Sequence, residues 1–165
     1  MKKLLYIVLF ISSFQSVAQK TLDELLTQYN TRSVPYISAE GLRALQLNEN
    51  ILILDTREAQ ESQISTIEGA KCVGYTNFSI AKTSKDIEDK NQPIIVYCSL
   101  GIRSEEIGER LQKAGYTNVQ NLYGGIFEWK NKGYPVLNAT NKKTDSVHTY
   151  SKTWSKWLLR GIPVF

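Results

Sequence analysis

The chain has 165 residues, of which 42% are hydrophobic and 22% charged, and its formal net charge is +4. This charge is mild, and no basic stripe with interleaved aromatic side chains is present, which argues against a nucleic-acid-binding protein. The sequence contains one histidine and two cysteines and shows no spacing typical of metal ligands, so we predict neither a metal site nor another cofactor.

The first residues have the pattern of a bacterial export signal. Residues 1–3 (Met-Lys-Lys) provide a positive start, the mostly apolar stretch 4–14 is too short to span a bilayer, and residues 16–18 (Ser-Val-Ala) suit cleavage. We therefore predict a signal peptide over residues 1–18 and an exported product, periplasmic or secreted. An amphipathic or buried N-terminal helix is disfavoured, because apolar residues fill every side of the segment. No later stretch is apolar for long enough to cross a membrane.

Residues 19–32 are predicted to form a helical extension ahead of the main domain. The segment from Leu22 to Tyr29 carries its leucines on one face of a helix, and the polar run that follows ends it. Ser38 then has the position of a helix cap, opening a second helix that buries Leu42 and Leu45.

The remaining segments alternate between strands and helices. Strands are expected at residues 51–54, 71–75, 94–97 and 119–122. Helices are expected around residues 80–87, from Ser104 to a stop at Gly115, and after the turn at Gly124-Gly125. This alternation predicts an α/β fold with a single domain over residues 33–137, in which helices flank both faces of an open, mostly parallel sheet. Ligands of such sheets bind at the carboxyl ends of the strands.

The loop after the strand at residues 94–97 is the candidate reactive site. A β-branched apolar run ends at Cys98, a short loop with one glycine and one arginine follows, and a helix begins at once. Loop N–H groups, the positive end of the helix and Arg103 favour an anion there, which lowers the pKa of the cysteine. A free cysteine at a strand end is otherwise a small buried hydrophobe. The combination with Gly101, Arg103 and the helix start at Ser104 favours a reactive thiolate.

Residues 98–104 (Cys-Ser-Leu-Gly-Ile-Arg-Ser) resemble the active-site loop of rhodanese-like sulfurtransferase domains. Three further segments are similar to motifs of that family and follow in the same order. They are residues 51–58, which end in Asp-Thr-Arg-Glu, residues 67–70 (Ile-Glu-Gly-Ala), and residues 122–136, which contain Gly-Gly-Ile-Phe-Glu-Trp. The resemblance covers roughly residues 33–137 and implies the fold of the family.

Three residues depart from the family's pattern, all in the connection from Glu58 to Gly69. Thr66 stands where many members have histidine, Glu68 where they have proline, and Ser62 where they often have an aromatic residue. These positions concern the packing of the connection more than the chemistry of the loop.

The resemblance also implies roles for individual residues. Cys98 is the expected nucleophile, and Arg103 is expected to orient and stabilise negative charge. Asp55 and Arg57 are expected to form a structural ion pair beneath the loop. The expected substrate- and anion-binding loop consists of Ser99, Leu100, Gly101, Ile102 and Ser104.

The activity implied is that of a sulfurtransferase. Cys98 would take sulfur from thiosulfate, a persulfide or a polysulfide as a cysteine persulfide and pass it to a thiol or cyanide. Four residues separate Cys98 from Arg103, whereas related cysteine phosphatases have a longer loop, which favours sulfur over phosphate. The uncharged loop residues favour a persulfide or polysulfide donor. Two alternatives stay open: a non-catalytic binding or regulatory module, and a periplasmic thiol-redox protein in which Cys98 pairs with Cys72 or with a partner.

Residues 138–165 extend beyond the family's minimal domain. Residues 138–145 are expected to form a polar linker, and His148 is expected at the surface. Within residues 148–165, helical spacing separates four apolar side chains: Tyr150, Trp154, Trp157 and Leu158. This amphipathic piece either packs onto the domain or binds a protein partner or an anionic membrane surface.

Overall fold

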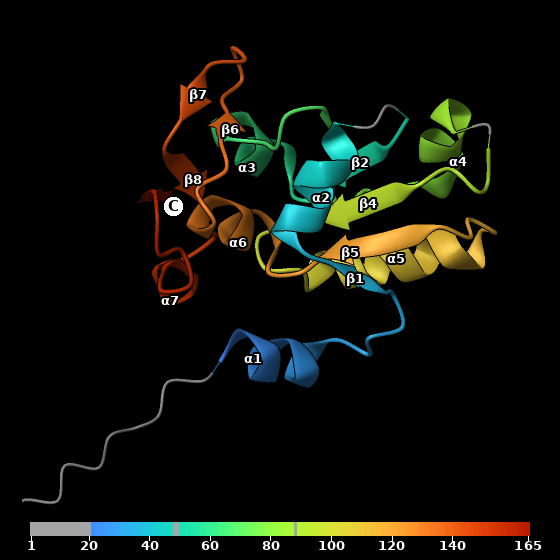
Figure 1. The fold of residues 1–165 in the computed structure, drawn as a ribbon, viewed down its shortest axis with the longest axis horizontal. Helices are drawn as coiled ribbons and strands as arrows, with labels where there is room; N and C mark the ends of the chain where they lie inside the picture. The colour runs from blue at the N-terminus through green and yellow to red at the C-terminus, as the bar shows by residue number, and fades with distance from the viewer. Residues whose placement is uncertain (1–20, 48–49, 88) are drawn as a thin grey trace, which may run out of the picture.

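The computed structural model describes residues 21–47, 50–87 and 89–165, so the predicted signal peptide at residues 1–18 lies outside the described residues. Five strands form one parallel sheet in the spatial order β1-β5-β4-β2-β3 (Figure 1). Their bounds are β1 (Tyr36–Ile37), β2 (Leu52–Asp55), β3 (Ala70–Cys72), β4 (Ile94–Tyr97) and β5 (Val119–Leu122). The predicted α/β class with a parallel sheet is confirmed.

Helices cover both faces of this sheet, as predicted. They are α1 (Leu22–Tyr29), α2 (Ala39–Gln46), α3 (Ala59–Ile64), α4 (Ile80–Thr83) with the 3-10 turn η1 (Ser84–Asp86), α5 (Arg103–Lys113) and α6 (Gly125–Asn131). None of the helices in the part of the chain that the structure describes is long and apolar enough to cross a membrane.

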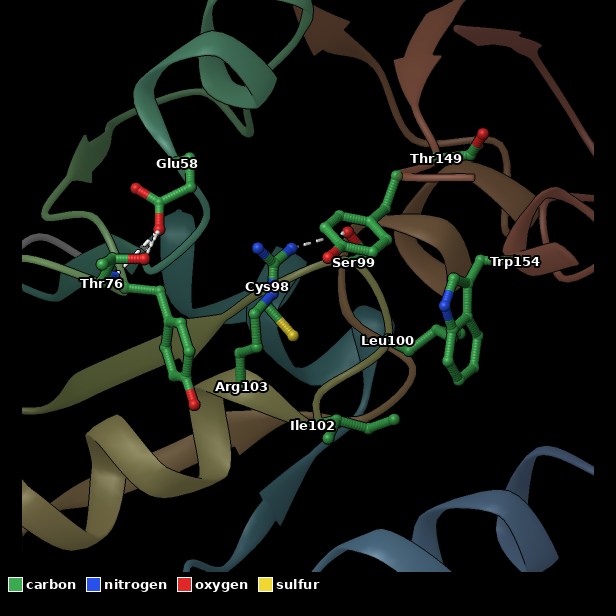
Figure 2. A pocket seen from close by; sticks show the side chains of 11 residues that line it. Glu58, Thr76, Cys98, Ser99, Leu100, Ile102, Arg103, Thr149 and Trp154 are labelled. Atoms are coloured by element: carbon green, nitrogen blue, oxygen red, sulfur yellow. Dashed lines mark hydrogen bonds between the residues drawn. The ribbon is translucent and has the colours of Figure 1, made fainter. Parts of the chain in front are cut away.

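The central strand β4 shows why two hydrophobic layers form. Its side chains alternate in direction and all four are buried, which explains the continuous apolar run in its sequence. Ile95 and Tyr97 pack with residues of α1, α2 and α6, whereas Ile94 and Val96 pack with residues of α5. The loop that follows β4 leads from the carboxyl end of this strand into α5 (Figure 2).

Two short elements were not expected from the sequence. β1 has two residues, and α3 is a six-residue helix of largely polar composition. Neither contains enough regularly spaced apolar residues to be recognised in the sequence. The third strand also ends earlier than the predicted range of residues 71–75, because its pairing with β2 extends only to Cys72.

The predicted polar linker at residues 138–145 is instead a β-hairpin. In it, β6 (Val136–Leu137) pairs with β7 (Lys143–Thr144) in antiparallel fashion. The Asn138 side chain closes the turn, since its Oδ1 accepts hydrogen bonds from the N–H groups of Thr140 and Lys142, each at 3.0 Å. An Asn side chain that bonds its own turn backbone stabilises such a reversal.

The last segment packs onto the domain, but not as one amphipathic helix. Strand β8 (Ser146–His148) pairs in parallel with β9 (Ile162–Val164), and the helix α7 (Lys152–Ser155) between them has only four residues. Val147 is fully buried in the hydrophobic layer of α6. Figure 1 shows this orange-to-red segment at the carboxyl edge of the sheet, where β8 contacts α3. The segment therefore forms two paired strands with a short helix between them, although the spacing of its aromatic residues had suggested one longer helix.

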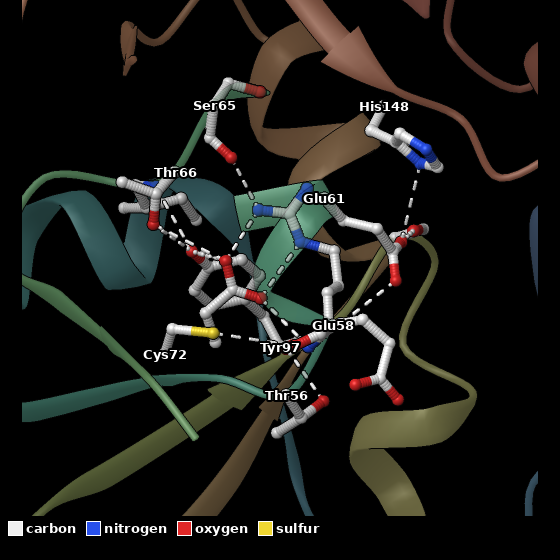
Figure 3. A network of polar contacts seen from close by, with 12 residues as sticks. Thr56, Glu58, Glu61, Ser65, Thr66, Cys72, Tyr97 and His148 are labelled. Atoms are coloured by element: carbon white, nitrogen blue, oxygen red, sulfur yellow. Dashed lines mark hydrogen bonds and ion pairs between the residues drawn. The ribbon is translucent and has the colours of Figure 1, made fainter. Parts of the chain in front are cut away.

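A buried ion pair supports the carboxyl end of the sheet. Arg57 donates two hydrogen bonds to Asp55, from Nε at 2.9 Å and from Nη2 at 2.6 Å, and both side chains are fully buried. The Tyr97 hydroxyl donates to the same carboxylate at 2.8 Å and lies 2.9 Å from the Thr66 hydroxyl (Figure 3). Threonine at position 66, one of the departures from the family's pattern, therefore completes this network.

Replacing Arg57 by methionine is expected to lower the free energy of unfolding by about 3–5 kcal/mol, because it leaves the Asp55 carboxylate buried without its cation. Urea denaturation would measure the change. Arg32→Met is the matched control, since Arg32 pairs with Asp23 at 2.7 Å with both side chains exposed and should contribute less than about 1 kcal/mol. Equal losses in the two variants would contradict a special role for the buried pair.

Candidate functional site

The loop from Cys98 to Arg103 is held in place by hydrogen bonds that groups outside the loop donate to its backbone carbonyls. The N–H groups of Ile126 and Phe127 in α6 donate to the carbonyls of Cys98 and Ser99, at 2.9 and 3.2 Å. The carbonyl of Gly101 accepts from the side-chain amides of Asn30 and Asn121, both at 2.8 Å. With these three carbonyls engaged outside, N–H groups of the loop are left for its interior, and Gly101 N–H donates to Cys98 Sγ at 3.2 Å.

Two glycines make this arrangement sterically feasible. Gly101 has φ +97°, a left-handed conformation that residues with a Cβ rarely adopt. Gly125 has φ +56°, and a Cβ at that position would lie 2.3 Å from the carbonyl oxygen of Cys98. The first turn of α6 can therefore approach the loop only because residue 125 is glycine.

The Cys98 thiol is buried, with 1% of its surface exposed, yet its pKa lies below the ordinary value. Burial alone would raise the pKa, but the charge of Arg103 and hydrogen bonds from Ser104 and the Leu100 backbone outweigh it. The lowered pKa favours the thiolate, which is the nucleophilic form of cysteine.

Arg103 is paired with Glu61, a residue that was not predicted. The guanidinium donates from Nη1 and Nη2 to the two carboxylate oxygens of Glu61, at 2.7 and 2.8 Å, and from Nη2 to the Ser99 hydroxyl at 3.2 Å. Burial alone would raise the pKa of Glu61, but the hydrogen bonds and charge of Arg103 lower it, so Glu61 is a carboxylate. The charge of Arg103 is thus largely compensated within the protein.

Glu61 reaches this position through α3. Its Oε2 accepts a hydrogen bond at 3.0 Å from the N–H of Glu58, the residue before the helix. Glu61 stands three residues after the N-cap residue Glu58, which is the spacing of a capping box, although the usual cap residue is Ser or Thr. This spacing is a local signal that could have located Glu61.

The C-terminal segment approaches the same loop. The His148 side chain is only 15% exposed, and its Nδ1 lies 3.8 Å from Glu61 Oε1 (Figure 3), so the expectation of a surface histidine was wrong. The guanidinium carbon of Arg103 lies 5.7 Å from the centre of the Tyr150 ring. Two segments that are distant along the chain thus surround the Cys98 loop: α3 on one side, whose Glu61 precedes Arg103 by 42 residues, and β8 with its extension on another.

A cavity of about 460 Å³ opens above Cys98 (Figure 2). Of the predicted loop residues, Ser99, Leu100 and Ile102 line it, together with the predicted catalytic residues Cys98 and Arg103. Gly101 instead contributes its N–H, and the Ser104 hydroxyl donates to Asn121 Oδ1 at 2.7 Å. The cavity is completed by Glu58, Tyr75, Thr76, Thr149, Tyr150 and Trp154.

Asp55, Arg57 and Cys72 do not line this cavity. Cys72 pairs with Asp55 on β2, and Asp55 pairs with Tyr97 on β4, so two strand spacings, or about 10 Å, separate Cys72 from β4. A disulfide needs Cα atoms within about 7 Å. A bridge between Cys72 and Cys98 would therefore require the backbone to move.

Comparisons with known proteins agree with this geometry. The family model of the rhodanese-like domain matches residues 38–132. Thiosulfate sulfurtransferase GlpE from Actinobacillus succinogenes is 36% identical over 95 residues, which cover 58% of this chain and 83% of that protein. A tRNA uridine(34) hydroxylase from Prochlorococcus marinus is 34% identical over 101 residues, which cover 57% of this chain but only 33% of the hydroxylase.

A solved structure extends the likeness to the fold. The thiosulfate sulfurtransferase of Pseudomonas aeruginosa matches with a TM-score of 0.61 at 22% identity, covering 83% of this chain and 25% of that one. At this identity the match shows the fold alone. The family model spans more than half of the sequence, and it shows that the chain belongs to the rhodanese-like domain family.

Proposed function

We propose that the protein is a sulfurtransferase that carries sulfur as a persulfide on Cys98. The observation that carries this proposal is the Cys98 thiol itself, which has a lowered pKa and accepts a hydrogen bond from the loop N–H of Gly101. The likeness to a thiosulfate sulfurtransferase over 83% of that protein's length adds support. The tRNA uridine(34) hydroxylases match over about a third of their length, and the mild charge of this chain offers no support for an RNA substrate.

The transfer proceeds in two displacements. The Cys98 thiolate attacks the outer sulfur of a donor; a bond forms between Sγ and that sulfur, and the bond to the rest of the donor breaks with its electron pair. The leaving group is a thiolate from a persulfide donor or sulfite from thiosulfate. A thiol or cyanide acceptor then attacks the outer sulfur of the Cys98 persulfide and regenerates the thiolate, as in other covalent catalysis.

The loop serves both states of the cysteine. The loop N–H groups that favour the thiolate would also stabilise the negative charge of a persulfide on Cys98, so negative charge is stabilised throughout the cycle. Arg103 contributes positive charge and is held in one orientation by Glu61. A non-catalytic binding module would have no use for this tuned thiol, and the separation of Cys72 from β4 weakens the proposal of an internal redox pair.

We further propose that the protein is exported, on the strength of the signal pattern in residues 1–18. Expression in a Gram-negative host should yield a periplasmic product whose N-terminus is Gln19, measured by N-terminal sequencing. Leu9→Arg should keep the full-length precursor in the cytoplasm. A wild-type chain that retains Met1 and stays in the cytoplasm would contradict export.

Exposure of the reduced protein to thiosulfate or an inorganic polysulfide should add one sulfur atom to the chain, because Cys98 captures the outer sulfur. Intact-protein mass spectrometry would measure the gain, and cyanide should remove it. Cys98→Ala should gain nothing, whereas Cys72→Ala should behave like the wild type. Loss of two hydrogens in the wild type, or no gain from either donor, would overturn the carrier function.

The rate of Cys98 alkylation should reach half its maximum at a pH below the ordinary thiol value, because a lowered pKa keeps the thiolate populated as the pH falls. Arg103→Gln should move this midpoint upward, since it removes the main favourable charge. Iodoacetamide kinetics in a Cys72→Ala background would measure both. Arg110→Gln, on the same helix, should leave the midpoint unchanged; equal shifts in the two variants would refute local control by Arg103.

A further inference from the structure

Part of the cavity wall above Cys98 comes from outside the matched rhodanese-like domain. The family model ends at residue 132, whereas Thr149, Tyr150 and Trp154 line the cavity from the C-terminal segment. Figure 2 shows Trp154 with Leu100 and Ile102 on the side toward which the Cys98 sulfur points, and Glu58 and Thr76 on the other side. The side of the cavity toward which the sulfur points is therefore lined partly by the loop and partly by a residue outside the matched domain.

Three residues of the C-terminal segment form this wall, Thr149, Tyr150 and Trp154. Contacts with the rest of the structure hold it in place. Thr149 is fully buried, and its N–H donates to the carbonyl of Val164 in β9 at 2.8 Å. Trp154 packs against the hydrophobic layer of α6, and its ring lies 6.3 Å from that of Tyr29 in an edge-to-face arrangement. Tyr150 has φ +64°, so the backbone turns sharply where its ring approaches Arg103.

The wall is apolar and aromatic. Tyr150 and Trp154 face the cavity with Leu100 and Ile102 from the loop, and Tyr75 lines it as well. Tyr150 keeps 65% of its surface exposed, so a bound molecule can cover apolar area that water now contacts. Burial of such area favours binding.

The charges of the cavity are poorly suited to a small dianion. Among the lining residues that the structure describes, Arg103 is the sole cation. Its guanidinium already donates two hydrogen bonds to the carboxylate of Glu61. Glu58 adds a carboxylate to the lining, and the Cys98 thiolate adds a further negative charge. Thiosulfate carries two negative charges and no apolar group, so it gains nothing from the wall and is repelled by the carboxylate.

We propose that Tyr150 and Trp154 determine specificity by selecting donors in which the transferred sulfur is bonded to a sulfur atom that carries an apolar organic group, namely organic persulfides and thiosulfonates. This inference rests on the proposed sulfurtransferase function. With a persulfide R–S–SH, the Cys98 thiolate bonds to the outer sulfur, the S–S bond breaks, and R–S⁻ leaves with the electron pair while the proton stays on the transferred sulfur. With a thiosulfonate, the leaving group is the sulfinate. The group R lies against the aromatic wall.

Two thiosulfonate anions of equal charge isolate the effect of the organic group. Methanethiosulfonate and benzenethiosulfonate share the reacting atoms and differ in the size of R, and thiosulfate serves as the dianionic reference. The full mature chain should show kcat/KM about tenfold higher for benzenethiosulfonate than for methanethiosulfonate, measured as thiocyanate formed with cyanide. Tyr150→Ala combined with Trp154→Ala should reduce this ratio to about two, because the aromatic contact is lost.

Control variants separate the wall from the fold. Phe165→Ala removes an exposed aromatic ring of the same segment that does not line the cavity, and it should keep the tenfold ratio. Trp154→Phe should keep most of it. The rate with methanethiosulfonate, which does not depend on the wall, shows that each variant is folded and carries a reactive Cys98.

The outcomes distinguish the two proposals. If no donor yields a persulfide on Cys98, the sulfurtransferase function fails. If all three donors react but benzenethiosulfonate has no advantage, or if its advantage survives loss of both aromatic side chains, the function stands and the specificity inference is overturned. A ratio that falls in the double variant while the methanethiosulfonate rate is retained supports the inference.

Discussion

The site depends on one constraint: backbone carbonyls of the loop after β4 accept their hydrogen bonds from groups outside the loop. A loop of six residues can present its N–H groups to one sulfur atom only if its carbonyls bond elsewhere. Here α6 and the side-chain amides of Asn30 and Asn121 supply those bonds, and Gly101 and Gly125 permit the close approach. The lowered pKa of Cys98 is therefore a property of the surrounding fold as much as of the loop.

The ion pair between Arg103 and Glu61 defines the second property of the site, its charge balance. A free arginine beside a thiolate would attract any anion, whereas an arginine held by a carboxylate is rigid and mostly neutralised. Negative charge on the Cys98 sulfur is stabilised by the charge of Arg103 and by hydrogen bonds from the loop. Under the proposed function, discrimination between donors is left to the surfaces farther from the sulfur.

The sequence predicted the parts of this site that depend on neighbouring residues. The apolar run before Cys98, the glycine and the helix start act within a few residues, and the strand, loop and helix appear where they were expected. Glu61 was missed because α3 is short and polar and shows no helical period of apolar residues. The wall of Tyr150 and Trp154 was missed because it depends on the parallel pairing of β8 with β9 and on the burial of Val147, which are contacts between distant segments.

The loop that activates the sulfur and the wall that surrounds it belong to different stretches of the chain. Thr149 and its neighbours are held by β9, whereas the Cys98 loop is held by α6 and β5. A substitution in the wall can therefore leave the thiolate and its hydrogen bonds intact. Over evolutionary time, such a division allows the C-terminal segment to diverge and adapt the cavity to new molecules while the reactive centre stays under separate selection.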